Sequence, residues 1–149
     1  KLGDSIVKVR VLIIASVLMV QGLSAADLTG IWLGQVPDRN STTDVSFRLV
    51  QTTDSLQGKL YEDYGSSPIT QGRIDGTTIR FVVVAREQAG NQVNLVSYRY
   101  AGEIVDGELE LTRERVGAVD AVSGANYVLR VRPEDEDKAP PKFRLKRLL

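Results

Sequence analysis

Carboxylates are the side chains of this chain best suited to acid–base chemistry, because its 149 residues include no histidine and no cysteine. That composition excludes Ser–His–acid and Cys–His nucleophile systems, and it excludes metal sites built from imidazole or thiolate ligands. Four of these acids fall close together, at Glu103, Asp106, Glu108 and Glu110. In "GELELTRE" the last two alternate with leucines, which puts both on the solvent face of one strand. A row of charges on such a face indicates solvation, so we expect no enzyme and no catalytic residues.

Two further groups of charged residues bear on chemistry. Glu62 and Arg113 are placed to meet at one end of the predicted fold, where a structural ion pair is favoured over a catalytic one. Five charged residues in a row at 134–138 lack the glycine-pivoted ligand order of calcium loops. This run predicts a solvated loop, and we expect no metal and no cofactor.

The first 26 residues have the three-part order of a secretory signal peptide. Lys1, Lys8 and Arg10 precede the apolar run "VLIIASVLMV", and small residues follow at Ser24 and Ala26. The run is too short for a permanent membrane anchor. We therefore expect a helical signal peptide over 1–26, cleavage after Ala26, and a periplasmic or secreted protein without a stable membrane span. A tethered or buried N-terminal helix is the alternative.

The charge of the remaining segment argues against nucleic acid as a partner. Residues 1–26 hold three of the 19 basic and one of the 19 acidic residues, so 16 basic and 18 acidic residues remain. A net charge of about −2 gives no electrostatic basis for binding nucleic acid or an anionic membrane. Because no disulfide can contribute, we expect residues 27–149 to form a single domain held by its packed core.

Apolar residues recur with period two from residue 28 onward, which is typical of β-strands, and no amphipathic helix of ten or more residues follows the signal segment. Strands are predicted at 29–36, 44–51, 55–62, 68–74, 78–86, 92–104, 108–114 and 142–148. The face predicted to point to the core carries Val45, Phe47, Leu49, Leu56, Gly58, Leu60, Ile79, Phe81, Val83, Val93, Leu95, Leu109, Leu111, Phe143 and Leu145. The opposite face is mostly polar, although strand 78–86 is apolar on both faces near 82–84.

The connections fall into two kinds. Asp-Gly pairs in "IDGT" (74–77) and "VDGE" (105–108) predict tight type I′ turns, and "QTTDS" (51–55) is a third short link. Longer polar links begin at Pro37, Glu62, Arg86 and Glu114, and an up-and-down meander would gather all four at one end. Loops on a rigid scaffold often bind ligands, although such loops can also be tolerated insertions. This end is therefore the predicted mouth, with the ligand-binding residues Phe47, Tyr64, Phe81 and Arg113.

The only tryptophan lies between two glycines, in Gly30-x-Trp32-x-Gly34. If the meander closes, the first strand pairs with the last, and Trp32 can meet Arg147 of "FRLKRLL". A guanidinium over an indole face is attractive, and the large ring would plug that end of the barrel. We expect Gly30, Trp32 and Arg147 to form this structural closure.

A G-x-W in the first strand with an arginine in the last resembles the calycin superfamily, which includes lipocalins, fatty-acid-binding proteins and avidins. The frame from "DLTGIWLGQV" to "FRLKR" is also similar to short exported bacterial proteins of unassigned function. The resemblance implies an all-β, antiparallel, roughly eight-stranded up-and-down barrel. The lipocalin T-D-Y element, its disulfides and the biotin-binding residues of avidins have no counterpart here, so no specific activity is implied.

Two functions remain open at the level of sequence. One is a binding module that takes a small, mainly apolar ligand at the mouth. The other is a structural or interaction module with a side-chain-filled barrel, which would self-associate or bind a protein partner through the outer face of strand 78–86, together with Tyr98 and Tyr100. "NYVLRV" (126–131) is either an extra strand or part of the link before the last strand.

Overall fold

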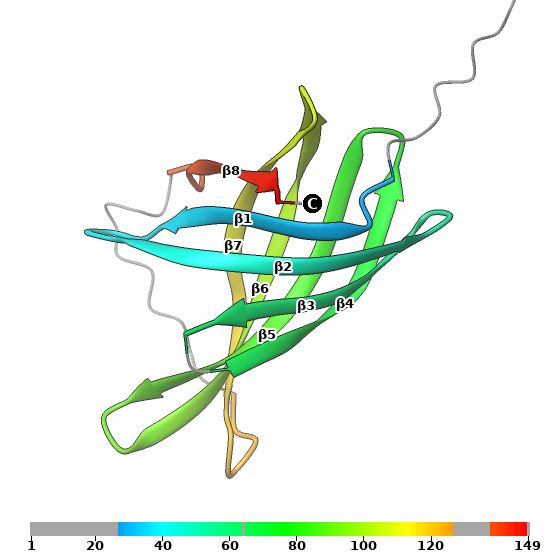
Figure 1. The fold of residues 1–149 in the computed structure, drawn as a ribbon. Helices are drawn as coiled ribbons and strands as arrows, with labels where there is room; N and C mark the ends of the chain where they lie inside the picture. Colours follow the sequence, from blue (N-terminus) through cyan, green and yellow to red (C-terminus); the bar gives the residue numbers. More distant parts are fainter. Residues whose placement is uncertain (1–26, 64, 127–137, 149) are drawn as a thin grey trace, which may run out of the picture.

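The computed structural model describes residues 27–63, 65–126 and 138–148. Eight antiparallel strands follow one another as a meander and close into a barrel (Figure 1). They are β1 (Gly30–Pro37), β2 (Thr42–Thr52), β3 (Ser55–Glu62), β4 (Gly65–Asp75), β5 (Thr78–Ala89), β6 (Gln92–Val105), β7 (Glu108–Asp120) and β8 (Lys142–Arg147). The predicted all-β fold class is confirmed. The predicted signal peptide, and residues 127–131 of the possible extra strand, lie outside the described residues.

The face of β6 differs from the prediction. Val93 and Leu95, expected in the core, lie on the outer face, whereas Tyr98 and Tyr100 point inward. Tyr100 pairs with Phe81 of β5, and in this register its side chain is only 1% exposed. Both faces of β6 carry apolar residues, so alternation alone leaves the face undecided. A shift by one residue would expose both tyrosine rings, and burial of these large rings favours the observed face.

The connections also differ from the predicted set of four long loops. Glu62 pairs with Gly65 across a short β3–β4 link, and Ala89 pairs with Gln92 across the β5–β6 turn. Residues 86–88 are polar, yet they continue β5 because β6 pairs with them up to the turn, in which Gly90 has a φ of 63°. The link 38–41 between β1 and β2 is longer, and so is the separation between the end of β7 at Asp120 and the start of β8 at Lys142. The prediction of four loose loops at this end is therefore wrong for the β3–β4 and β5–β6 links.

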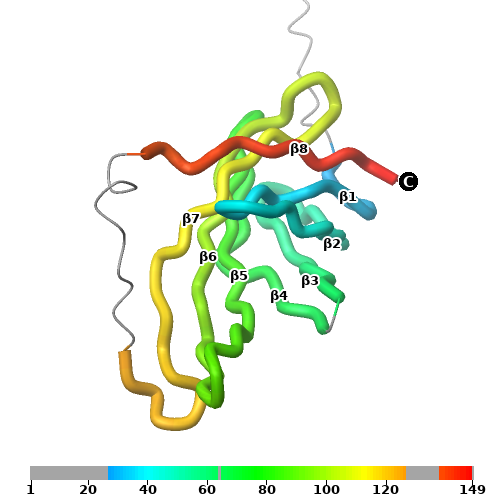
Figure 2. Tube along the Cα trace, turned by 90° about the vertical axis from the view of Figure 1, so that its left-hand side faces the viewer, coloured from blue at the N-terminus to red at the C-terminus, as the bar shows by residue number. Residues whose placement is uncertain are grey.

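Strands β5, β6 and β7 extend beyond the rest of the barrel. β4 pairs with β5 only as far as Val83, and β8 pairs with β7 only as far as Thr112. Among the eight strands, later residues of β5 and β7 therefore pair only with β6. Figure 2 shows this three-stranded extension reaching away from β8 and β1. The extension continues the inner face of the barrel past the point where the barrel is closed.

The barrel closes between β1 and β8, where Trp32 pairs with Arg147 and Gly34 with Leu145. The Arg147 guanidinium lies 4.7 Å from the centroid of the buried Trp32 ring, and the indole Nε1 donates a hydrogen bond of 2.9 Å to the Leu28 carbonyl. A Cβ on Gly34 would lie 2.5 Å from a carbonyl oxygen of β8, so only glycine lets the two strands approach this closely. Over this paired stretch the first and last strands leave no open sheet edge.

Candidate functional site

A cluster of aromatic rings is buried inside the barrel. Phe81 stacks on Tyr100 with ring centroids 4.9 Å apart, and Phe47 meets both rings edge-on at 5.5 Å. Phe143 approaches Tyr100 at 6.3 Å, again edge-on. All four side chains are buried, and they belong to one core with Trp32 and the inward aliphatic residues. Phe47 and Phe81, predicted to contact a ligand, are thus packed against protein.

A polar cluster follows the rings at the end opposite Trp32, which we call the far end. The Tyr98 hydroxyl donates a hydrogen bond to the Glu87 carboxylate, and Arg115 forms an ion pair with the same carboxylate at 3.2 Å. Arg113 lies over the Tyr98 ring at 4.7 Å, and its proximity to Tyr100 lowers the pKa of that hydroxyl. These side chains lie on the inner face of β5, β6 and β7, so the interior changes from apolar to charged toward the extension.

Burial keeps both tyrosines of this cluster protonated. It raises the pKa of Tyr100 to about 12, against smaller lowering effects of Arg113. Burial also raises the pKa of Tyr98, and the hydrogen bond to Glu87 adds to the effect. Neither hydroxyl can serve as a base at neutral pH. No buried side-chain nitrogen or oxygen of the described residues lacks a hydrogen-bond partner, so the far-end cluster has the properties of a self-satisfied structural network.

Of the remaining predicted ligand contacts, Arg113 belongs to the far-end cluster and Tyr64 lies outside the described residues. Glu62 and Arg113 form no ion pair in the part of the chain that the structure describes. Their common neighbour is Tyr100, whose pKa Glu62 raises and Arg113 lowers. The predicted ion pair between Glu62 and Arg113 is therefore absent among the described residues, and both side chains instead influence Tyr100.

The acidic row of β7 is occupied by surface ion pairs with β8. Glu110 meets Lys142 at 3.3 Å and Arg144 at 3.1 Å, and Glu108 meets Arg144 at 3.4 Å. Hydrogen bonds from Lys142 and then Arg144 lower the pKa of Glu110. Both carboxylates accept these contacts on the outer surface, and each exposed pair contributes little to stability.

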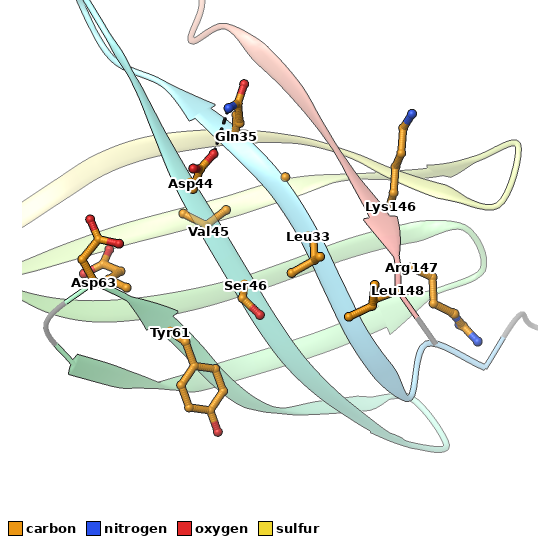
Figure 3. Close-up of a pocket in the computed structure, with 12 residues that line it drawn as sticks. Leu33, Gln35, Asp44, Val45, Ser46, Tyr61, Asp63, Lys146, Arg147 and Leu148 are labelled. Atoms are coloured by element: carbon orange, nitrogen blue, oxygen red, sulfur yellow. Dashed lines mark hydrogen bonds between the residues drawn. The ribbon is translucent and has the colours of Figure 1, made fainter.

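An apolar groove lies on the outside of the barrel, across the closure. It has a volume of about 660 Å³ and is lined from β8, β1, β2 and β3, with Leu33, Tyr61 and Leu148 among its walls (Figure 3). These three side chains are 39%, 41% and 56% exposed, and Ile31 beside them is 37% exposed. We call Ile31, Leu33, Tyr61 and Leu148 the seam face. Sequence reasoning missed it, although the apolar residues flanking Trp32 on β1 signal it.

The groove has charges of opposite sign along its two sides. Asp44 and Asp63 lie on the side of β2 and β3, and Lys146 lies on β8 (Figure 3). Asp44 accepts a hydrogen bond of 2.8 Å from Gln35, and Lys146 lies 3.8 Å from Glu108. The apolar strip between them is therefore bordered by an acidic side and a basic side.

Comparisons of the chain with protein-family models, with curated proteins and with solved structures give no match. Across residues 27–63, 65–126 and 138–148, no group of three or more acidic side chains is placed to hold a metal ion. The same part of the chain has no helix long and apolar enough to cross a membrane.

Proposed function

We propose that this protein is a non-enzymatic interaction module, in which the filled barrel is a scaffold and the seam face is the contact surface. One observation carries the proposal: the rings occupy the middle of the barrel, while large apolar side chains are exposed together on its outside. Soluble monomers rarely group exposed apolar residues, and such groups typically mark protein–protein contacts.

The partner that fits the seam face best is a second copy of this chain. In a two-fold dimer the same surface faces itself, so a residue on one side of the groove meets residues on the other side of the partner's groove. The side that carries Asp44 and Asp63 would then face the side that carries Lys146. This complementarity aligns the two apolar strips, whose burial supplies the affinity.

The molecular mass in solution tests this proposal. Sedimentation equilibrium between about 1 µM and about 1 mM, a span of about 4 kcal/mol in binding free energy, is expected to show a concentration-dependent rise to twice the mass of the monomer. Leu33→Glu should weaken the association at least tenfold. Val84→Glu is the matched control, because Val84 is 38% exposed on the outer face of β5. A monomer at every concentration refutes the proposal.

The control also separates the two candidate surfaces. Weakening by Val84→Glu alone would move the contact to the outer face of β5, the surface that the sequence indicates. On that face Val84 lies across from Ser97 of β6, and Leu95 lines the same shallow hollow. Tyr98 and Tyr100, which the sequence assigns to the same contact, point inward and are excluded from it.

Binding of a small molecule is the second candidate, supported by the far-end cluster. Its arginines and tyrosines lie where the closed barrel ends and the extension begins, so a ligand there would meet polar groups before apolar ones. Native mass spectrometry of protein purified without detergent, followed by solvent extraction, tests this candidate. A retained molecule of defined mass would support it, and protein without one would count against it.

The cellular setting that we propose is outside the cytoplasm. The basic, apolar and small-residue order of residues 1–26 supports export, and the G-x-W with a terminal arginine supports a calycin-like barrel. Expression in a bacterial host followed by N-terminal sequencing tests the first point. A mature chain that begins at Asp27 is the expected result, and retention of residues 1–26 in the cytoplasm would contradict it.

A further inference from the structure

A second groove lies on the outer face of β4, β5 and β6, and it shares no residue with the seam groove. Its volume is about 660 Å³, and its lining residues are Gln71, Arg73, Arg80, Phe81, Val82 and Arg99. Three of these six residues are arginines, and each of them is exposed. The groove is therefore a local concentration of positive charge in a chain with equal numbers of acidic and basic residues.

The arginines are placed against one another by the strand pairing. Arg73 of β4 lies directly opposite Arg80 of β5. Arg99 of β6 lies opposite Val82, diagonally beside Arg80. Like charges directly opposite each other destabilise a sheet, so this arrangement has a cost to the folded protein when nothing lies between the guanidinium groups.

The nearby acids do not neutralise the pair. Arg73 and Arg80 form no ion pair among the described residues, although Asp75 and Glu103 lie farther along the same face. Arg99 meets Glu114 at 3.4 Å, and both side chains of that pair are more than half exposed. An exposed pair of this kind is weak, so Arg99 keeps most of its capacity to bind another anion.

The backbone of β4 is distorted at this groove. Thr70 pairs with Val82 and Arg73 with Arg80, so Gln71 and Gly72 together face one residue of β5, which is a β-bulge. Gln71 has a φ of 52°, a left-handed conformation that costs a non-glycine residue about 1 to 2 kcal/mol. Strain of this kind is concentrated at binding and catalytic sites.

The bulge also decides where Arg73 points. Ile69 and Ile74 both face the core although they are five residues apart, a spacing that puts two residues of a regular strand on opposite faces. The extra residue of the bulge shifts the alternation by one position and brings both onto the inner face. Without the bulge, either Ile74 or Ile69 would leave the core. With it, Gln71 and Arg73 are both on the outer face beside Arg80, so the distortion builds the groove.

We propose that this groove binds a phosphate monoester, with its phosphate between the guanidinium groups of Arg73 and Arg80 and with Arg99 and the Gln71 amide as further donors. A guanidinium presents a planar set of N–H donors that matches two phosphate oxygens at once. A dianion between two facing arginines also removes their mutual repulsion. A volume of this size is typical of small-molecule sites, so the ligand extends beyond the phosphate.

Binding is tested with two sources of the same phosphate chemistry at constant, low ionic strength. The first probe is glycerol phosphate in solution, followed through the arginine side-chain NH resonances of the full chain. The second is phosphatidylcholine vesicles with and without phosphatidic acid, followed by co-sedimentation. Binding of either probe supports the site and identifies whether its phosphate is soluble or belongs to a lipid headgroup. Failure of both probes to bind overturns the proposal.

Variants show whether any binding belongs to this groove. Arg80→Gln and Arg73→Gln should each weaken binding at least tenfold, and Arg80→Lys should weaken it less, since it keeps the charge and loses the planar donor set. Arg48→Gln on β2 is the matched control, because it removes one exposed charge of the outer surface away from the groove. Equal weakening by Arg48→Gln and Arg80→Gln would mean general attraction to positive charge and would overturn the proposal. The test is independent of self-association through the seam face.

Discussion

Truncation of the central ring is the most direct test of a barrel filled by its own side chains. Phe81 is 1% exposed, stacks on Tyr100 at 4.9 Å and meets Phe47 edge-on at 5.5 Å. Removal of a buried phenylalanine ring costs about 3 to 5 kcal/mol, through lost transfer free energy and the cavity left behind. Both ring contacts are lost as well, so we expect Phe81→Ala to lie in the upper half of that range.

Such a loss is large for a domain of this size. At about 2.1 cal/mol/K per residue, a loss of roughly 4 kcal/mol lowers the melting temperature by about 16 °C. Urea unfolding followed by far-UV circular dichroism and by the fluorescence of buried Trp32 measures the change in free energy. Phe81→Leu keeps part of the volume and provides a milder variant if Phe81→Ala does not fold. Val84→Ala, on the outer face of the same strand, is the control and should change stability by less than about 1 kcal/mol.

The size of the effect decides the interpretation. A loss below about 1 kcal/mol for Phe81→Ala, similar to that of the control, would mean that the ring is not tightly packed. The interior would then have room for a ligand, and the seam face would no longer be favoured over an internal binding site. A loss in the expected range would agree with the observed ring contacts.

Three further predictions concern the closure, the far end and the spacing of strands. Arg147→Ala should lower the free energy of unfolding by roughly 0.5 to 1 kcal/mol, because the guanidinium over Trp32 is exposed to solvent. The variant should also shift the tryptophan emission, and unchanged emission and stability would refute the contact. Because the pKa of Tyr100 is raised from 10.0 to about 12, its stabilising effect is complete below pH 10 and is lost as the pH rises toward 12, by about 2 to 3 kcal/mol. Urea titrations across that range should show a weaker pH dependence for Tyr100→Phe than for the unaltered chain, and an equal dependence would contradict the assignment. Gly102→Ala should lower the free energy of unfolding by more than about 2 kcal/mol, since its Cβ would lie 1.9 Å from a carbonyl oxygen of β7. A Cβ on Gly117 would meet nothing within 4 Å, so Gly117→Ala should change the urea midpoint little. Equal effects of the two variants would refute the steric explanation.

Most strands could be predicted because one face of each is exposed to solvent and the other is buried in the core. The alternation of "GELEL" and the Asp-Gly turn before it place β7 directly, and the left-handed φ values of Asp106 and Gly107 agree with the type I′ turn that this dipeptide favours. β6 was predicted on the wrong face because Val93 and Leu95 compete with Val96 and Tyr100 for the interior. That competition is decided by packing against β5, which local alternation does not contain.

The candidate surfaces were harder to predict than the strands. The approach of Arg147 to Trp32 follows from closure of the meander, so the first and last strands suffice to anticipate it. The meeting of Arg73 with Arg80 depends on a bulge that shifts the pairing of β4. A bulge adds one residue to one strand, and the sequence signals it only through a glycine next to Gln71. Surfaces built by cross-strand neighbours are therefore visible only once the register is known.

The closure between β1 and β8 has a consequence for the order of folding. β8 pairs with β1 only over Trp32–Gly34, whereas β5 pairs with β6 along Thr78–Ala89. The long hairpin joins residues that are near in sequence and can form early, while the closure joins the two ends of the domain and pays a large loop entropy. Amide hydrogens of β8 should therefore exchange faster than those in the middle of β5 and β6. Transient release of β8 uncovers two sheet edges at once, and an edge uncovered in this way can accept β8 of another copy as a domain swap.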